Sequence, residues 1–276
     1  MIDLARHPCF SGHAHGRHGR LHIPCAPGCN FNCAYCGRGV DAGGEQLPGR
    51  TMRIVRPGEV AGYVAERLAA HPEIAVLGIA GPGEPLFNPE TFQVLEILRR
   101  EFPGYILCLG TNGYLLPENV SRLKELGVET ITVTLNSIRP ETNCRLNPAI
   151  IGASGEVIEG ARCGELLVER QLQGIRMAAS ADMIVKVNTV YVPGVNDGEM
   201  TEIAEKARSL GAHIMNIMPL RPAGRLSHVA PPSPMEIHGA RNRAEAFLPQ
   251  FRSCTQCRAD ACGLLQEDGA PQGCIK

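Results

Sequence analysis

Six short, largely apolar runs, separated by longer amphipathic segments, constrain the fold of this chain more than any other feature. The runs cover residues 21–24, 74–81, 105–110, 130–136, 183–192 and 213–220. Apolar runs of this length are typical of parallel strands covered on both faces. Between two of them, Val60, Val64 and Leu68 recur on one face of an expected helix. Strands that alternate with helices predict an α/β fold with a parallel sheet.

Helix signals fill the gaps between these runs. Pro57 precedes the first helix, which we expect to end near His71, and Pro117 and Gly127 bound the third. Further helices are expected over 92–98, from about 154 to 178, over 200–210 and briefly within 231–239. A segment of about 20 residues before residue 154 has no clear period.

Right-handed crossovers curl such a sheet, so we predict a partial (β/α) barrel of the TIM type with about six parallel strands. Two cysteine-bearing extensions flank it. The expected division is an N-terminal extension (1–24), a barrel domain (25–222) and a C-terminal extension (223–276).

Charge and cysteine content limit the classes of function. A net charge of −1 gives no electrostatic basis for binding nucleic acid or an anionic membrane. The N-terminal residues have no signal-peptide core, and no apolar run is long enough to span a bilayer. We therefore expect a cytoplasmic location. The 12 cysteines then indicate metal binding rather than disulfides, because the cytosol keeps thiols reduced.

One loop concentrates the metal-binding signal. Residues 25–36 read CAPGCNFNCAYC, in which Cys29, Cys33 and Cys36 form C-x3-C-x2-C with Tyr35 before the last cysteine. Thiolates this close in sequence converge without long-range folding, and iron–sulfur clusters are held by such thiolates. Three protein ligands would leave one iron of a 4Fe–4S cluster open to a chelating small molecule.

Other polar and glycine-rich elements follow the predicted strands. They are GPGEP (81–85), TNG (111–113), Asn136, Asn188 and NIMPL (216–220). Ligand sites of β/α barrels lie at the carboxyl ends of the strands, so these elements should share one site with the cysteine loop. Residues 1–24 add five histidines and Cys9. From spacing alone, this segment is either a set of metal ligands or a solvated tail.

The cysteine motif resembles the signature of the radical S-adenosylmethionine (SAM) enzymes. The resemblance implies a 4Fe–4S cluster on Cys29, Cys33 and Cys36 that binds SAM and takes part in catalysis. GPGEP resembles the glycine-rich motif of that family, whose backbone carbonyls accept from the SAM amino group. The residues expected to contact the cofactor are Tyr35, Gly81, Pro82, Gly83, Glu84, Asn112, Asn136, Asn188 and Ile217. Anchoring of loops is the alternative role of the three asparagines, and spacing leaves both roles open.

Motifs along the whole chain give a closer resemblance. HPCFS, RLHIP, IAGPGEPL, TNGYLLP, VPGVND, NIMPL and CTQCRADA occur in this order from residue 7 to about residue 265. They are similar to those of the NifB family of radical SAM proteins. That resemblance implies fusion of two 4Fe–4S substrate clusters, with a SAM-derived carbide and a sulfur, into NifB-co, the precursor of the nitrogenase FeMo cofactor. One SAM would provide the methyl group and another a radical that abstracts hydrogen from it.

The resemblance also implies ligands and partners. Cys9, His22 and Cys108 match positions that hold one substrate cluster, and Cys254 and Cys257 match a C-x2-C for the second. Expected partners are an Fe–S cluster donor and a carrier or scaffold protein that accepts the product, with no nucleic acid or membrane.

Several positions depart from the family pattern. Ala42 stands where a further cysteine ligand is expected, so the second cluster has one ligand fewer or takes Cys25, Cys262 or Cys274. Glu84 and Ser137 are smaller departures, and Cys144 and Cys163 have no assigned role. Two alternatives stay open: another radical SAM enzyme with auxiliary clusters, or a non-catalytic iron–sulfur or zinc protein that uses the C-terminal cysteines.

Overall fold

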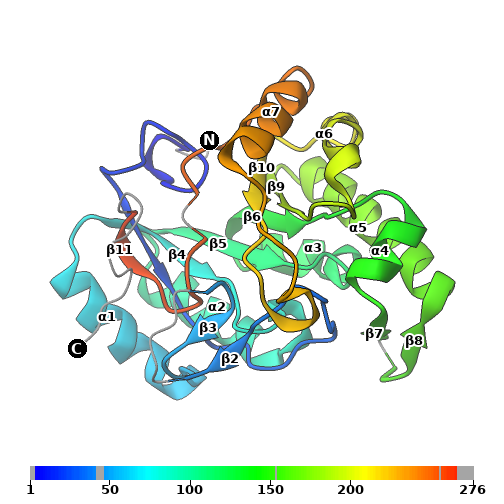
Figure 1. Cartoon of the computed structure of the whole chain (residues 1–276). Coiled ribbons are helices and arrows are strands. Elements are labelled where there is room, and N and C mark those ends of the chain that lie inside the picture. The colour runs from blue at the N-terminus through cyan, green and yellow to red at the C-terminus, as the bar shows by residue number, and fades with distance from the viewer. Residues whose placement is uncertain (1–3, 42–46, 153, 255, 266–276) are drawn as a thin grey trace.

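A curled sheet of seven strands forms the centre of the computed structural model (Figure 1), which describes residues 4–41, 47–152, 154–254 and 256–265. Its strands are β1 (Gly19–His22), β4 (Ile74–Ile79), β5 (Ile106–Thr111), β6 (Val128–Thr134), β9 (Ile184–Tyr191), β10 (Ile214–Pro219) and β11 (Cys262–Leu264). They lie in the order β10-β9-β6-β5-β4-β1-β11. All neighbours pair in parallel except β11, which runs antiparallel to β1. The predicted partial barrel with six parallel strands is confirmed.

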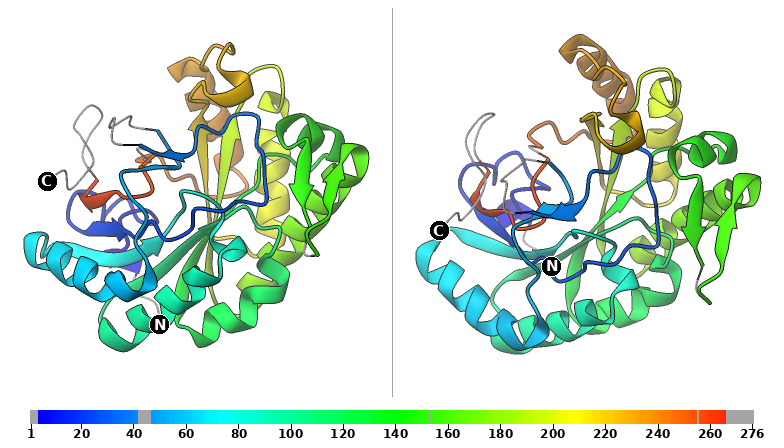
Figure 2. Two further views of the ribbon diagram at one scale, coloured as in Figure 1. Left: turned by 90° about the horizontal axis from the view of Figure 1, so that it is seen from below. Right: turned by 60° about the horizontal axis from the view of Figure 1, so that its bottom comes forward.

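Helices cover the outer side of this sheet (Figure 2). They are α1 (Val60–Ala70), α2 (Pro89–Glu101), α3 (Leu116–Glu125), α4 (Pro140–Leu146), α5 (Gly160–Ser180), α6 (Met200–Ser209) and α7 (Pro234–Glu245). Short 3-10 turns are η1 (Leu4–Arg6), η2 (Pro57–Glu59), η3 (Pro85–Phe87), η4 (Asp197–Glu199) and η5 (Gly224–Leu226). Every residue of β4 is buried, as expected for a strand with helices on one side and a filled barrel interior on the other.

The loosely patterned segment before residue 154 is more ordered than the sequence indicates. It contains α4 and β7 (Ala149–Ile151), which forms a hairpin with β8 (Val157–Glu159). The helix expected from about residue 154 therefore begins only at Gly160, because β8 occupies the residues before it. The hairpin packs on the cysteine loop, because the Ile151 amide donates to the Asn30 carbonyl at 2.8 Å. The Ala34 amide likewise donates to the Leu146 carbonyl at 2.8 Å. A seven-residue helix and three-residue strands are too short to produce a readable period.

The C-terminal helix is also longer than its sequence signal. α7 has 12 residues, and Ser233 caps its first turn in a capping box with Glu236. The Ser233 Oγ accepts from the Glu236 amide at 3.3 Å, while the Glu236 carboxylate accepts from the Ser233 amide at 2.7 Å.

Both expected extensions contribute strands to the central sheet. β1 lies in the N-terminal segment and β11 in the C-terminal segment, and the two strands pair with each other at one edge of the sheet. A small parallel pair, β2 (Gly39–Val40) with β3 (Arg50–Thr51), follows the cysteine loop. In the described ranges, no helix is long and apolar enough to cross a membrane.

Candidate active site

One cavity of about 360 Å³ lies inside the curled sheet and collects most of the predicted site residues. Those that line it are Cys9, His22, Cys29, Cys33, Tyr35, Cys36, Pro82, Gly83, Glu84, Cys108, Asn112, Asn136, Asn188, Cys254 and Cys257. Two predicted residues do not line it. Ile217 is fully buried in the core, and Gly81 lies at the base of the GPGEP turn with a positive φ of 122°.

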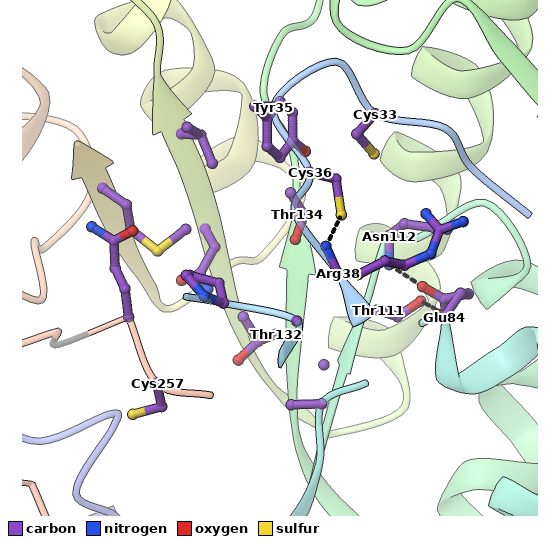
Figure 3. A pocket seen from close by; sticks show the side chains of 18 of the residues that line it. Cys33, Tyr35, Cys36, Arg38, Glu84, Thr111, Asn112, Thr132, Thr134 and Cys257 are labelled. Atoms are coloured by element: carbon purple, nitrogen blue, oxygen red, sulfur yellow. Dashed lines mark hydrogen bonds between the residues drawn. The ribbon is translucent and has the colours of Figure 1, made fainter. Parts of the chain in front are cut away.

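The thiols of the cysteine loop are held by the loop's own backbone. The Phe31 amide donates to Cys29 Sγ at 3.5 Å, and the Arg38 amide donates to Cys36 Sγ at 3.4 Å (Figure 3). Burial raises the pKa of Cys29 to about 11. The pKa of Cys33 is also raised, first by burial and then by the charges of Cys36 and Cys29.

Thiolates in such a place repel one another and lack water, so they need cations between them. A 4Fe–4S cluster supplies these cations, and N–H donors to cysteine sulfur are typical of its surroundings. The cysteine loop therefore fits the cluster. No three His, Cys, Asp or Glu side chains of the described segments converge closely enough to hold a single metal ion.

The GPGEP turn fixes the start of the cysteine loop. The Gly83 amide donates to the Ala26 carbonyl at 2.7 Å, and the Glu84 amide donates to the Gly28 carbonyl at 2.9 Å. A Cβ on Gly83 would lie only 2.0 Å from the Gly28 oxygen, so no other residue allows this approach. Asn88 adds two bonds, accepting from the Gly28 amide at 3.0 Å and donating to its carbonyl at 2.9 Å.

Glu84 is a buried carboxyl that ties its own turn to the end of β5. It accepts from the Thr111 hydroxyl at 2.6 Å, the Asn112 amide at 2.6 Å and the Leu86 amide at 3.1 Å. Figure 3 shows it reaching Thr111 and Asn112 at the end of β5. Burial raises its pKa to about 7 in spite of these donors. The side chain thus fixes the TNG turn.

The three predicted asparagines are used differently. Asn136 donates to the Tyr35 hydroxyl at 2.7 Å and accepts from the Val190 amide at 2.9 Å, so it anchors the motif tyrosine. Asn112 donates to the Asn30 side chain at 2.8 Å and accepts from the Tyr114 amide at 3.0 Å.

The third asparagine, Asn188, lines the cavity, and its side-chain oxygen accepts from the side-chain nitrogen of Asn216 at 3.2 Å. The side-chain N–H groups of Asn112 and Asn136 are engaged within the protein, whereas those of Asn188 donate to none of the described residues.

His22 and Cys108 are brought together by strand register. His22 on β1 pairs with Gly78 on β4, and Gly78 pairs with Cys108 on β5. A Cβ on Gly78 would lie 3.3 Å from the His22 ring and 3.8 Å from the Cys108 Cβ. The glycine thus leaves the space between the two side chains open. Cys9, from the N-terminal segment, lines the same cavity.

The imidazole of His22 is oriented by a partner that the sequence did not indicate. Its Nδ1 lies 3.0 Å from the Arg258 carbonyl, and a carbonyl only accepts, so Nδ1 carries the proton. Nε2 then keeps a lone pair for a metal, the arrangement usual for histidine ligands. Burial lowers the pKa of His22 to about 4, which keeps this lone pair available.

The C-terminal cysteines enter the cavity from another direction, and Figure 3 shows Cys257 on a different segment from Cys33 and Cys36. Arg20, fully buried on β1, donates to Cys257 Sγ at 3.1 Å and to the Gly263 carbonyl at 2.6 Å. The Gln256 amide donates to Cys254 Sγ at 3.4 Å.

Among the described residues, the remaining cysteines do not line the cavity. Cys25 is in the core, and Cys262 is disulfide-bonded. Cys163 is buried next to Cys144, between α4 and α5. Ala42 and Cys274, on which the expected ligation of the second substrate cluster depends, lie outside the described residues.

Sequence reasoning missed several residues of the site: Arg20, Asn88, Gln171 and Lys186. The Gln171 amide nitrogen donates to the Asn112 and Thr134 carbonyls, both at 2.7 Å, and so joins the ends of β5 and β6. Only Lys186 carried a signal. It precedes Asn188 by two positions in a predicted strand, and alternation places both side chains on the same face.

Comparison with known proteins identifies the family of this chain and several relatives. The radical SAM superfamily model matches residues 23–207. The FeMo cofactor biosynthesis protein NifB of Klebsiella pneumoniae is 40% identical over 275 residues, 97% of this chain and 58% of that protein. The NifB of Methanocaldococcus jannaschii is 40% identical and matches 95% of this chain and 87% of its own length. The chain thus spans little more than half of the bacterial relative and most of the archaeal one.

Solved structures show the same fold at low sequence identity. A radical SAM methyltransferase from Sphaerobacter thermophilus aligns over 85% of this chain and 64% of its own, with a TM-score of 0.57 and 22% identity. Streptococcus suis SuiB bound to the precursor peptide SuiA aligns over 92% of this chain and 52% of its own, with a TM-score of 0.61 and 13% identity.

Proposed function

Since this chain belongs to the radical SAM superfamily and, within it, to the NifB family, we propose that it makes a precursor of the nitrogenase FeMo cofactor. In this proposal it fuses two 4Fe–4S substrate clusters with a SAM-derived carbide and a sulfur to form NifB-co. A cluster donor would supply the substrates, and a carrier or scaffold protein would accept the product. One observation carries the proposal: a single cavity is lined by the loop cysteines and by Cys9, His22, Cys108, Cys254 and Cys257.

The first step of the proposal concerns the SAM site. Cys29, Cys33 and Cys36 would hold the resident 4Fe–4S cluster and leave one iron open for SAM. When bound there, SAM supplies a methyl group in one use and a 5′-deoxyadenosyl radical in another. The GPGEP turn keeps the loop in place through Gly83 and Glu84, and Asn136 fixes the ring of Tyr35.

The second step concerns the substrate clusters. Cys9, His22 and Cys108 would hold one cluster, and the Arg258 carbonyl directs His22 Nε2 to it. Cys254 and Cys257 would hold the other, with Arg20 beside Cys257. Because all of these residues line the cavity of the loop cysteines, the substrates and SAM would meet without leaving the protein.

The test uses the whole chain after anaerobic reconstitution with iron and sulfide. Incubated with SAM and a reductant, it should form 5′-deoxyadenosine and S-adenosylhomocysteine together, one product for each use of SAM. The matched Cys33→Ala variant should form neither.

If the wild-type protein forms neither product, it is not a radical SAM enzyme of this kind. Formation of 5′-deoxyadenosine alone, unchanged by Cys9→Ala or Cys108→Ala, would instead support the alternative of another radical SAM enzyme with auxiliary clusters. The non-catalytic iron–sulfur or zinc alternative is not favoured, because the superfamily model covers most of the chain.

A further inference from the structure

A buried lysine lies inside the barrel beside the N-terminal cysteine. Lys186 projects from β9 on the same face as Asn188 and is only 5% exposed. Its Nζ donates to the Cys9 carbonyl at 3.0 Å. The same Nζ lies 4.7 Å from the ring centre of Phe10 and 5.4 Å from that of Phe251.

These contacts do not neutralise the ammonium. Among the described residues no carboxylate forms an ion pair with Lys186, and Glu84, the one carboxyl that lines the cavity, is engaged at the end of β5. Two aromatic faces and one carbonyl compensate only part of the cost of removing an ammonium from water. A cation kept in such a place indicates that the cavity is built to receive negative charge.

The charge of Lys186 reaches each of the three ligands proposed above for one substrate cluster. It lowers the pKa of the Cys9 and Cys108 thiols against the larger effect of burial, which raises both. It also lowers the pKa of the His22 imidazole, together with Arg20. His7 is affected in the same way. Lys186 also lines the same cavity as Cys9, His22 and Cys108, so its ammonium shares the space in which a ligand common to the three would bind.

We propose that Lys186 is a positioning residue that supplies positive charge and N–H donors to the 4Fe–4S substrate cluster on Cys9, His22 and Cys108. This inference rests on the proposed function. Cysteine thiolates and bridging sulfides place negative charge on the outside of such a cluster, and hydrogen bonds to sulfur stabilise it. With the cluster bound, the lysine gains the anionic partner that it otherwise lacks.

The experiment compares Lys186→Met, Lys186→Arg, Cys9→Ala and wild type in two measurements. Methionine has a similar length and no charge, and it suits a space between two phenylalanine rings. Lys124→Met removes an exposed lysine of α3 and is the control for loss of one positive charge. The first measurement is iron and sulfide content after anaerobic reconstitution. The second is the melting temperature of the metal-free protein.

Lys186→Met should lose about four irons, as Cys9→Ala does, because one 4Fe–4S cluster is no longer retained. Lys186→Arg should retain most of them and Lys124→Met all of them. In the metal-free protein Lys186→Met should melt no lower than wild type, because an unpaired buried charge is gone. Loss of iron without a lower melting temperature of the metal-free protein distinguishes this role from that of a structural tether.

Two results would overturn the inference. If Lys186→Met keeps all of its iron while Cys9→Ala loses about four, the site exists but Lys186 does not position its cluster. If Lys186→Met loses iron and also melts well below wild type without metal, the lysine acts as a structural tether. If Cys9→Ala itself keeps all of its iron, the assignment of the substrate-cluster site is wrong, and the proposed function fails first.

Discussion

The cavity contains two kinds of cysteine site, which the chain builds in different ways. The first comes from one loop, in which Cys29, Cys33 and Cys36 are held by amides of the same loop. The second is assembled from distant segments, with Cys9 before the sheet, His22 on β1 and Cys108 on β5. Strand register alone aligns His22 with Cys108 across Gly78. The loop site therefore depends on one local clamp, and the assembled site depends on the whole barrel.

The charges around the two sites also differ. The loop site is supported by a buried carboxyl, Glu84, whereas the neighbours of the assembled site are the imidazole of His7 and the cations of Arg20 and Lys186. The two regions should therefore respond in opposite directions to pH and to different extents to added side-chain volume.

The largest effect is expected at the clamp of the loop site. Gly83→Ala places a Cβ 2.0 Å from the Gly28 oxygen, a backbone atom that cannot turn aside. We expect a loss of about 5 kcal/mol or more in the free energy of unfolding. Urea denaturation of the metal-free protein measures it. Gly62→Ala is the control, because position 62 is an exposed position of α1 and the added Cβ meets nothing within 4 Å. This change should stabilise the protein by about 0.5–1 kcal/mol. Equal effects of the two changes would disprove the clamp.

Acid should destabilise the folded protein through His7, which lies close to the assembled site. Burial lowers the pKa of His7 from 6.5 to about 3, and its Nε2 lies 3.2 Å from the Thr130 hydroxyl. Below pH 6.5 the unfolded chain binds a proton that the folded chain does not, so stability falls as pH falls. The loss approaches about 4 kcal/mol near pH 3 to 4. His7→Gln should remove this part of the slope in urea unfolding over a pH series, while His22 keeps its own part. An unchanged slope would contradict the prediction.

The carboxyl near the loop site should give the opposite sign. Burial raises the pKa of Glu84 from 4.5 to about 7, so between these values the folded chain holds a proton that the unfolded chain releases. Stability is therefore lost as pH rises through this window, by about 3 kcal/mol in total. Glu84→Gln stays neutral and should lose less stability than wild type between pH 5 and pH 7 in the same series. A steeper loss in the variant would refute the assignment.

The smallest effect is expected between the ligands of the assembled site. Gly78→Ala places a Cβ 3.3 Å from the His22 ring, close enough to displace the ring without blocking the strand. The free energy of unfolding should fall by only about 1 kcal/mol. Reconstituted protein should nevertheless lose about four irons, because His22 no longer faces Cys108 correctly. Iron content equal to that of wild type would show that this glycine is not needed for the site.

The same contrast explains what the sequence could predict. The loop site was predictable because its ligands and their spacing are local, and the six parallel strands were predictable from their apolar runs. Gly78 became meaningful only after register placed it between His22 and Cys108. The bond from His22 to the Arg258 carbonyl involves a backbone atom that leaves no trace in residue type. Lys186 was within reach, since it lies two residues before Asn188 and on the same face of β9, but a lysine in an apolar run is easily assigned to an edge.

The hairpin of β7 and β8 had no readable signal for a related reason. Its strands are short and bind the cysteine loop through backbone atoms, as between Ile151 and Asn30. Contacts of this kind depend on the fold that brings the segments together and only weakly on side-chain pattern.

The separation of the two kinds of site can be measured directly by iron content in a variant that lacks the loop ligands. The full chain with Cys29→Ala, Cys33→Ala and Cys36→Ala is reconstituted anaerobically beside wild type. We expect it to lose about four irons and all formation of 5′-deoxyadenosine, and to keep the iron that a further Cys108→Ala change removes. Loss of all iron from the triple variant would contradict two independently built sites in one cavity.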